Sequence, residues 1–303
     1  MSSLMSSLSI AAVTRATRPS FLILAPLCVL LGASLAANQP ITLHGLDVAL
    51  VLLGGLLAHA GVNLLNEYDD FRSGLDLITR RTPFSGGSGA LPEHPSAAPQ
   101  VLMAALAMLV GLVAIGVYFL WLRGWPILII GVSGVFLIIA YTRWLTRSPL
   151  GCLLAPGLGF GPIMVLGTLI ALGGRVDETA LIGAAVTLLL VSELLLINQF
   201  PDVEADRRIG RRHLPIVVGL PIASRWVAGL LLGAFALIAL GRLYDLLPVN
   251  TWLAFLAFPA ALWIALRLPK ALKNEESLQK IMGVNVATLL TTLLLLAVGV
   301  WLA

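Results

Sequence analysis

Long apolar stretches separated by short polar segments recur along the whole chain. A helix that crosses a hydrocarbon core of about 30 Å needs about 20 mostly apolar residues. Nine stretches approach or exceed that length, and we predict membrane-spanning helices at 20–37, 46–66, 97–120, 125–142, 151–172, 178–200, 215–240, 250–267 and 281–302. Their apolar residues are consecutive, whereas the strands of a membrane barrel would alternate. The pattern therefore predicts an all-α fold, a polytopic membrane helical bundle that forms one domain over residues 1–303.

Composition agrees with this pattern and narrows the class of protein. Apolar residues make up 59% of the chain and charged residues only 11%, against roughly 25% charged residues in ordinary globular proteins. A sizeable soluble domain, a disordered chain and a disulfide scaffold are excluded, and we expect Cys28 and Cys152 to be buried free thiols. The net charge of +4 is first a topology signal in a membrane protein. We expect the lipid bilayer, and no nucleic acid, as a partner.

The basic residues gather on one side of the predicted bundle. Of the 19 Lys and Arg residues, only Arg123, Arg175 and Arg242 fall on the other side. The positive-inside rule then places the N-terminus inside and the C-terminus outside the cell, in a cytoplasmic (inner) membrane. An alternative is that the first stretch is a signal peptide, because Arg15 and Arg18 precede it and small residues end it. That alternative would leave an even number of helices.

Acidic residues gather on the same side as the basic residues, in two short segments. The segments are 63–76 (NLLNEYDDFRSGLD) and 198–212 (NQFPDVEADRRIGRR), and each begins at the inner end of a predicted helix. Topology does not require acids there, so their clustering needs another cause. The segments align at a constant offset of 132 residues, which pairs Asn66 with Asn198, Asp70 with Asp202, and Arg80 with Arg212. This alignment predicts two pseudo-repeats of about four helices each.

Oxygen-bearing side chains recur every fourth residue within these segments. Asn198, Asp202 and Asp206 would form one column on a continuous helix, although Pro201 predicts a kink just before Asp202. Stacked carboxylates repel one another unless a cation neutralises them. Magnesium is held by one or two carboxylates together with substrate phosphates, and arginine binds phosphate oxygens bidentately. The segments therefore indicate a magnesium–diphosphate site; the alternative is a solvated helix end whose charges pair with their neighbours.

These two motifs resemble those of the UbiA superfamily of membrane prenyltransferases. NEYDDFRSGLD is similar to the family's first Asp-rich motif, NDxxDxxxD, and DVEADRRIGRRHLPIVVG to its second motif, DxxxD followed by a Gly-basic-basic stretch. Nine helices with the N-terminus inside also match the family. The chain most resembles the MenA-like branch, which attaches a polyprenyl chain to 1,4-dihydroxy-2-naphthoate. Two departures are Glu67 in place of the usual Asp, and a third acid at Asp76 instead of position 74.

The resemblance implies an activity and a set of site residues. The activity is Mg²⁺-dependent transfer of a polyprenyl group from an isoprenoid diphosphate to an aromatic acceptor, 1,4-dihydroxy-2-naphthoate in the synthesis of menaquinone-type quinones. The implied metal ligands are Asn66, Asp70, Asp76, Asn198, Asp202 and Asp206. The implied diphosphate-binding residues are Arg18, Arg81, Arg143, Arg211 and Arg212. Asp70 and Asp202 are the implied catalytic carboxylates, and either could take the proton that the acceptor releases.

The resemblance also places the active site on the cytoplasmic side, under cap loops. The loop RRTPFSGGSGALPEH at 80–94 is similar to the family's cap between the second and third helices, and its glycines could present backbone amides to phosphate. Two further polar residues fall inside predicted helices. Glu193 is either functional or bonded to a neighbouring helix, and His59 is assigned no role.

Three alternatives remain open from the sequence. The acceptor could instead be 4-hydroxybenzoate, a chlorophyll precursor, haem or a glycerol phosphate backbone, all of which relatives of the family use. A transporter is a second alternative, but it predicts acids near the middle of the membrane and not at helix ends. The third is a non-enzymatic protein that binds polyprenyl lipids.

Overall fold

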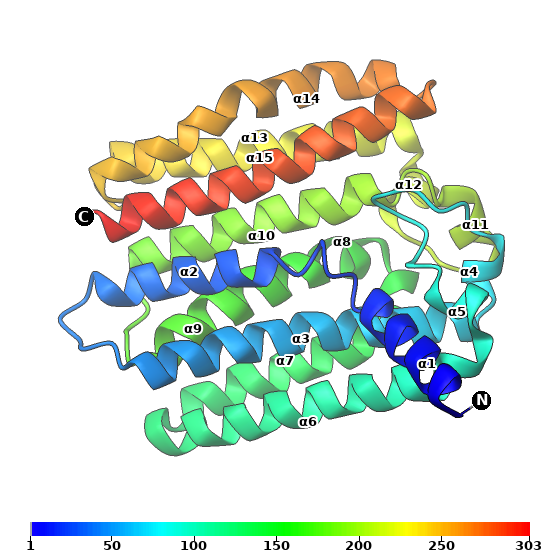
Figure 1. Cartoon of the computed structure of the whole chain (residues 1–303). Helices are drawn as coiled ribbons and strands as arrows, with labels where there is room; N and C mark the ends of the chain where they lie inside the picture. The colour runs from blue at the N-terminus through cyan, green and yellow to red at the C-terminus, as the bar shows by residue number, and fades with distance from the viewer. Residues whose placement is uncertain (1) are drawn as a thin grey trace.

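The computed structural model describes residues 2–303 and the side chains from Ser9 onward. In this part of the chain the regular structure is entirely helical. The α-helices are α1 (Ser2–Ala16), α2 (Leu24–Ala37), α3 (Gly45–Arg72), α4 (Leu75–Ile78), α5 (Ala90–Glu93), α6 (Ala98–Arg123), α7 (Trp125–Arg143), α8 (Pro149–Leu158), α9 (Leu166–Ala171), α10 (Glu178–Asn198), α11 (Val203–Arg208), α12 (Leu214–Val218), α13 (Leu220–Leu243), α14 (Phe258–Ala271) and α15 (Glu275–Trp301). Long helices lie side by side, and the short helices α1, α4, α5, α11 and α12 gather at one end (Figure 1).

Eight helical segments, some of them made of two consecutive helices, are long and apolar enough to cross a membrane. This confirms a multi-pass helical bundle. A π-helical turn at Gly159–Val165 joins α8 to α9, and a 3-10 turn at Val249–Ala257 leads into α14. The remaining expected span, 20–37, forms α2, whose 14 residues reach only about 21 Å. The count of nine crossings, the orientation in the cell and the two pseudo-repeats stay predictions.

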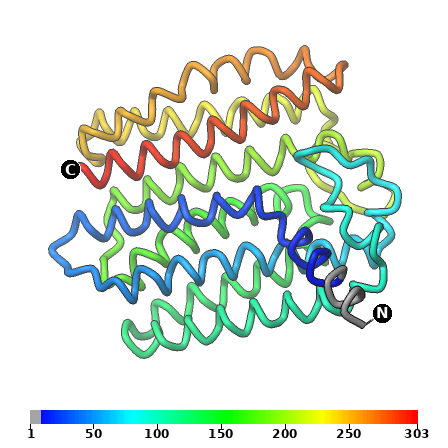
Figure 2. The backbone as a smooth tube through the Cα atoms, viewed as in Figure 1, coloured from blue at the N-terminus to red at the C-terminus, as the bar shows by residue number. Residues whose placement is uncertain are grey.

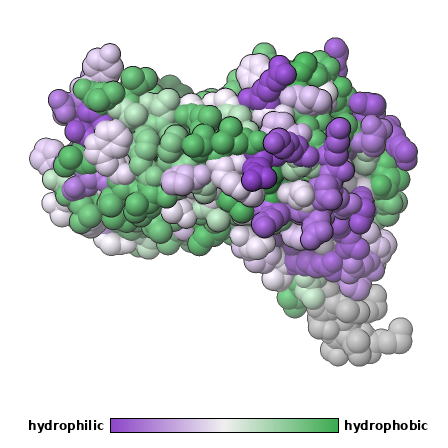
Figure 3. Space-filling model, turned by 90° about the horizontal axis from the view of Figure 1, so that it is seen from above, coloured by the Kyte–Doolittle hydropathy of each residue, from purple (hydrophilic) through white to green (hydrophobic). Residues whose placement is uncertain are grey.

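The two ends of the bundle differ in polarity. Helix α1 and the C-terminus lie at opposite ends of the bundle (Figure 2). Hydrophilic residues gather mainly at the end that carries the N-terminus, and hydrophobic residues cover the rods (Figure 3). Exposed tryptophans, among them Trp121 and Trp125 at one end and Trp144 at the other, lie where a membrane–water interface would meet the rods.

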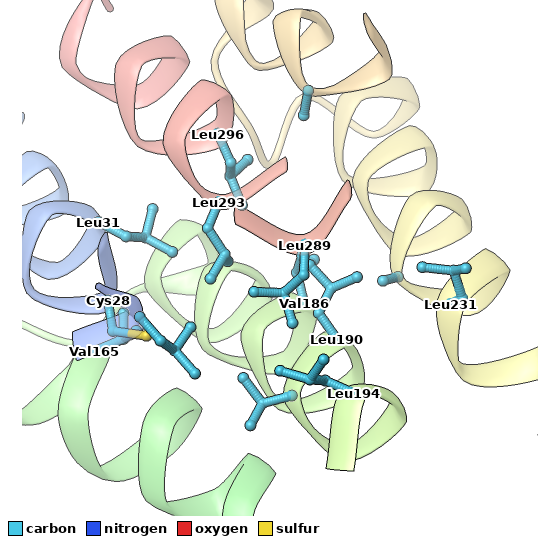
Figure 4. Close-up of a cluster of buried hydrophobic side chains, with 14 of the residues drawn as sticks. Cys28, Leu31, Val165, Val186, Leu190, Leu194, Leu231, Leu289, Leu293 and Leu296 are labelled. Atoms are coloured by element: carbon cyan, nitrogen blue, oxygen red, sulfur yellow. The ribbon is translucent and has the colours of Figure 1, made fainter. Parts of the chain in front are cut away.

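The core lies where α2, α10, α13 and α15 meet (Figure 4). Lipid is as apolar as leucine, so helices in a membrane associate through close packing and not through the hydrophobic effect. Gly161 illustrates this, because a Cβ there would lie 2.3 Å from the carbonyl oxygen of Ala184 on α10. Cys28 and Cys152 are buried free thiols as expected. Glu193 is fully buried and accepts a hydrogen bond of 2.9 Å from Asn285 on α15.

Candidate functional site

A cavity of about 910 Å³ runs into the bundle from the polar end. Its walls come from α2, α3, α4, α6, α7, α8, the π-helical turn, α9, α10, α11 and α15. All six expected metal ligands line it: Asn66, Asp70, Asp76, Asn198, Asp202 and Asp206. The fold therefore brings the two acid-rich segments, 132 residues apart in sequence, to one cavity.

Arg211 connects the two segments directly. Its Nη1 donates to Asp206 Oδ1 at 2.9 Å, and its Nη2 contacts Asp70 Oδ1. The second oxygen of Asp206 lies 2.8 Å from His213 Nε2. Burial alone would lower the pKa of Arg211, but Asp70 and Asp206 raise it above its ordinary value. The Arg211 side chain is 17% exposed. Because its pKa is raised, it stays charged and acts as the counter-ion of both segments.

Local backbone structure explains how Arg211 reaches this position. Helix α10 ends at Asn198, and Pro201, which has no N–H to donate, follows before α11 begins at Val203. Gly210 has a φ of 83°, a left-handed conformation that glycine adopts without strain. This turn folds the chain back, so that the Arg211 N–H donates to the Asp206 carbonyl at 3.0 Å.

Three buried oxygen atoms at the cavity have no hydrogen-bond partner among the described residues: Asp76 Oδ2, Asn198 Oδ1 and Asp202 Oδ1. Burial, with Glu67 and Asp70 nearby, raises the pKa of Asp76 to about 8. Burial, with Asp206 nearby, raises the pKa of Asp202 to about 7. Unpaired buried oxygens are costly, and a cation would relieve that cost.

The oxygen atoms at the polar end of the cavity suit a magnesium ion that is shared with substrate phosphates. Within residues 2–303, no three His, Cys, Asp or Glu side chains lie close enough together to hold a metal ion by themselves. Magnesium does not need such a cage, because it keeps several waters and binds one or two carboxylates plus substrate phosphates. Unpaired oxygens from both segments, facing one cavity, suit this mode of binding.

The glycine-rich loop covers the polar end of the cavity. The Gly86 N–H donates to Asp202 Oδ2 at 3.2 Å, and the Ser88 N–H donates to Glu67 Oε2 at 3.0 Å. Gly87 has a φ of 75°, and a Cβ there would lie 2.7 Å from Asp76 Oδ1. The loop amides thus bind carboxylates of both segments, where the sequence suggested that they would bind phosphate.

Glu67, the departure from the usual motif, is fully buried. Arg18 Nη2 lies 3.5 Å from Glu67 Oε2, and the Ser88 hydroxyl contacts Glu67 Oε1. Glu67 is not among the cavity-lining residues. It instead ties the turn before α2 and the glycine-rich loop to α3.

The five expected arginines divide into two groups. Arg18 and Arg211 line the cavity. The other three do not line it: Arg81 pairs with Glu93, Arg143 pairs with Asp69, and the Arg212 N–H bonds the Thr146 carbonyl. Their role in binding diphosphate stays a prediction.

Beyond the polar end, the cavity is apolar. Its deeper walls include Phe160 and Met164 from the π-helical turn. Lining residues on α6 and α7, such as Val117 and Val132, are also exposed apolar side chains. These two helices therefore give the cavity an apolar wall.

Sequence reasoning missed some polar contacts of the site. The Thr142 hydroxyl donates to Asn66 Oδ1, and His213 bonds Asp206. Neither contact follows from helical spacing, because each joins residues of separate elements. The signals in the sequence were the position of Thr142 and His213 beside candidate arginines, at 143 and 212, and their place in stretches that resemble the family, where Tyr141-Thr142-Arg143 matches the fourth loop and His213 stands where Thr is common.

A sequence model of the UbiA prenyltransferase family matches residues 25–289. The chain is 28% identical over 230 residues to a 1,4-dihydroxy-2-naphthoate octaprenyltransferase of Bacillus subtilis (strain 168), covering 71% of this chain and 72% of that protein. It is 28% identical to a digeranylgeranylglyceryl phosphate synthase of Methanoculleus marisnigri (strain ATCC 35101 / DSM 1498 / JR1) over 254 residues, covering 81% and 79%. Among solved structures, a UbiA homologue from Archaeoglobus fulgidus bound to GPP and Mg²⁺ aligns with a TM-score of 0.62 at 14% identity, covering 96% of this chain and all of that one.

Proposed function

The chain belongs to the UbiA prenyltransferase family, and from that premise we propose that it transfers a polyprenyl group from an isoprenoid diphosphate to 1,4-dihydroxy-2-naphthoate with the help of Mg²⁺. The observation that carries this proposal is the cavity itself. It joins acidic side chains from the two segments, together with Arg18 and Arg211, at the polar end to a deep apolar interior. A long apolar chain with a charged diphosphate head has this same division.

The residues of the polar end would divide the work of binding the diphosphate. Asn66, Asp70, Asp76, Asn198, Asp202 and Asp206 would hold Mg²⁺. Arg18 and Arg211 line the cavity and would bind phosphate oxygens. When bound, Mg²⁺ would stabilise the negative charge that grows on the diphosphate as the allylic carbon–oxygen bond breaks.

A carboxylate, Asp70 or Asp202, would take the proton that the aromatic substrate releases. Asp202 Oδ1 has no partner among the described residues, whereas Asp70 Oδ1 is bound to Arg211. A general base needs an oxygen within hydrogen-bond reach of the proton. This contrast favours Asp202 for the proton.

The acceptor is proposed from the relatives. The chain is 29% identical over 251 residues to a 1,4-dihydroxy-2-naphthoate octaprenyltransferase of Escherichia coli (strain K12), covering 80% of each chain, as well as similar to the Bacillus protein. A glycerol phosphate acceptor is the second candidate, because the Methanoculleus relative is a digeranylgeranylglyceryl phosphate synthase. We also propose that the polar end faces the cytoplasm from the inner membrane, since the basic residues gather there.

The test uses the full chain purified in detergent. It is incubated with Mg²⁺, geranylgeranyl diphosphate and, separately, 1,4-dihydroxy-2-naphthoate, 4-hydroxybenzoate or geranylgeranylglyceryl phosphate. We expect the naphthoate to be prenylated and diphosphate to be released, with EDTA abolishing both. Prenylation of another acceptor alone would reject the naphthoate, and turnover unaffected by EDTA would reject the metal. A reporter fused after Ala303 should report the outer side of the membrane.

A further inference from the structure

His59 is a buried polar residue that the functional assignment leaves unused. It lies in the middle of α3, is 7% exposed and lines the cavity. Its Nδ1 has no hydrogen-bond partner among the described residues. Its ring packs edge-on against Phe160, with centroids 4.8 Å apart and planes at 77°. A buried nitrogen without a partner lowers stability, so its presence beside a cavity needs a reason.

The position of His59 on α3 is the second observation. His59, Asn63, Asn66 and Asp70 follow at spacings of four, three and four residues, which places them on one face of the helix. The three residues nearer the polar end have hydrogen-bond partners. Asn63 donates to the Thr17 carbonyl, Asn66 accepts from Thr142, and Asp70 contacts Arg211. His59 is thus the one member of this face whose side chain makes no hydrogen bond among the described residues.

His59 also marks the depth at which the cavity changes character. It lies about 10 Å below Asn66 along the helix axis. The next lining residues on α3 are Ala58, Gly55, Gly54 and Val51, which are apolar or lack a side chain. His59 and Phe160 therefore stand between the charged end and the apolar interior.

We propose that His59 and Phe160 form a subsite for a hydroxylated aromatic acceptor, in which His59 accepts a hydrogen bond from a ring hydroxyl. This inference rests on the proposed function. The charged groups hold the diphosphate at the polar end, so an acceptor that approaches the allylic carbon from the opposite side meets this depth of the cavity. An unprotonated imidazole nitrogen accepts from a hydroxyl, and an aromatic ring packs edge-to-face against Phe160.

A purely structural role for His59 makes a different prediction. If the imidazole only fills space, its replacement changes stability or all ligand binding alike, whatever groups the ligand carries. The subsite predicts a loss that depends on the ligand's hydroxyl. A pair of ligands that differ only in that group separates the two.

The experiment measures binding of 4-hydroxy-2-naphthoate, whose hydroxyl is free of the carboxylate, and of 2-naphthoate to the full chain in detergent, without Mg²⁺ or donor, so that no turnover occurs. We expect the wild type to bind the hydroxylated ligand about tenfold more tightly. His59→Leu should lose this preference, and His59→Gln, which can still accept a hydrogen bond, should keep part of it. The matched control His44→Leu changes an exposed histidine and should keep all of it. Phe160→Leu should weaken both ligands equally.

No hydroxyl preference in the wild type would overturn the subsite, whether or not any variant folds. An unchanged preference in His59→Leu would also overturn it. Turnover is measured separately on the wild type. A wild type that prefers the hydroxylated ligand through His59 but transfers no prenyl group would refute the proposed function and leave the subsite standing. If the wild type prenylates the naphthoate but His59→Leu keeps the full hydroxyl preference, the subsite is refuted and the proposed function stands.

Discussion

The two acid-rich segments share an Asn and an Asp at the same spacing, Asn66 with Asp70 and Asn198 with Asp202, and yet reach the cavity by different routes. In the first, α3 continues without a break to Arg72, so Asn66 and Asp70 share one straight helix. In the second, α10 ends at Asn198, the chain turns at Pro201, and Asp206 lies on the separate helix α11. A shared spacing in the sequence therefore does not imply a shared local structure.

The difference lies in which segment supplies the positive charge. Arg211 belongs to the second segment, and the turn at Gly210 directs it to both Asp206 and Asp70. The first segment has no equivalent, because Thr79 stands at the position aligned with Arg211, and the neighbouring Arg80 pairs with Glu275 at the surface. Asp70 of the first segment thus depends on Arg211 of the second segment for its counter-ion, and the two segments form a single site.

Removing a carboxylate from either segment should have the largest effect. We expect Asp70→Ala and Asp202→Ala each to lower kcat by roughly 10²-fold to 10³-fold, because each removes a group that stabilises the transition state. Prenyl transfer under saturating Mg²⁺ checks this. Glu204→Ala, a change in an exposed side chain of the second segment, should leave kcat unchanged. Near-normal turnover in either aspartate variant would mean that its segment is not part of the site.

Removing the shared counter-ion should cost stability as well as activity. Arg211→Leu leaves Asp70 and Asp206 buried without their main cation, which we expect to cost about 3–5 kcal/mol. Thermal unfolding in detergent measures the loss. Arg207→Leu removes only an exposed pair with Glu204 and should cost about 1 kcal/mol or less. Equal Tm values for the two variants would contradict the dependence of one segment on the other.

The raised pKa values of Asp76 and Asp202 test each segment by pH. The folded protein keeps these protons up to about pH 8 and 7 respectively, whereas the unfolded chain releases them near pH 4. Between these values the unfolded chain binds fewer protons, so the free energy of unfolding falls as pH rises. We expect the Tm of metal-free protein to drop by roughly a few degrees from about pH 5 to 8. Asp76→Asn and Asp202→Asn should each flatten the slope, and a Tm that rises over this range would refute the assignment.

The smallest expected effect comes from removing the proline that follows α10 in the second segment. Pro201→Ala restores an N–H and removes a clash with the carbonyl of Ile197, so α10 can extend and move Asp202. We expect roughly a tenfold fall in kcat/KM with less than about 1 kcal/mol change in stability. Steady-state kinetics beside a thermal scan separates the two. Unchanged kcat/KM would show that the bend does not position Asp202.

The sequence predicted the parts of this architecture that depend on local pattern. Apolar length located the spans, and the shared spacing of Asn66 with Asp70 and of Asn198 with Asp202 identified residues that line one cavity. Pro201 predicted a kink just before Asp202, and in the structure α10 ends at Asn198, three residues before that proline.

Contacts between distant elements lay beyond that reasoning. Nothing in the sequence distinguishes Arg211 from Arg212, yet only Arg211 lines the cavity, because the turn at Gly210 decides which of the two points inward. The burial of Glu67 under Ser88 similarly depends on a loop 21 residues away. The π-helical turn that carries Phe160 follows from packing against α10 around Pro162, which no periodicity in the sequence reports.

The central claim, that both segments hold one metal–diphosphate, is tested most directly by binding without chemistry. Geranylgeranyl S-thiolodiphosphate, which resists ionisation, is titrated into wild type, Asp70→Ala and Asp202→Ala, each with Mg²⁺ and with EDTA. We predict tight binding only to the wild type with Mg²⁺, and weak, metal-independent binding to both variants. Metal-dependent binding that survives in either variant would contradict a site shared between the two segments.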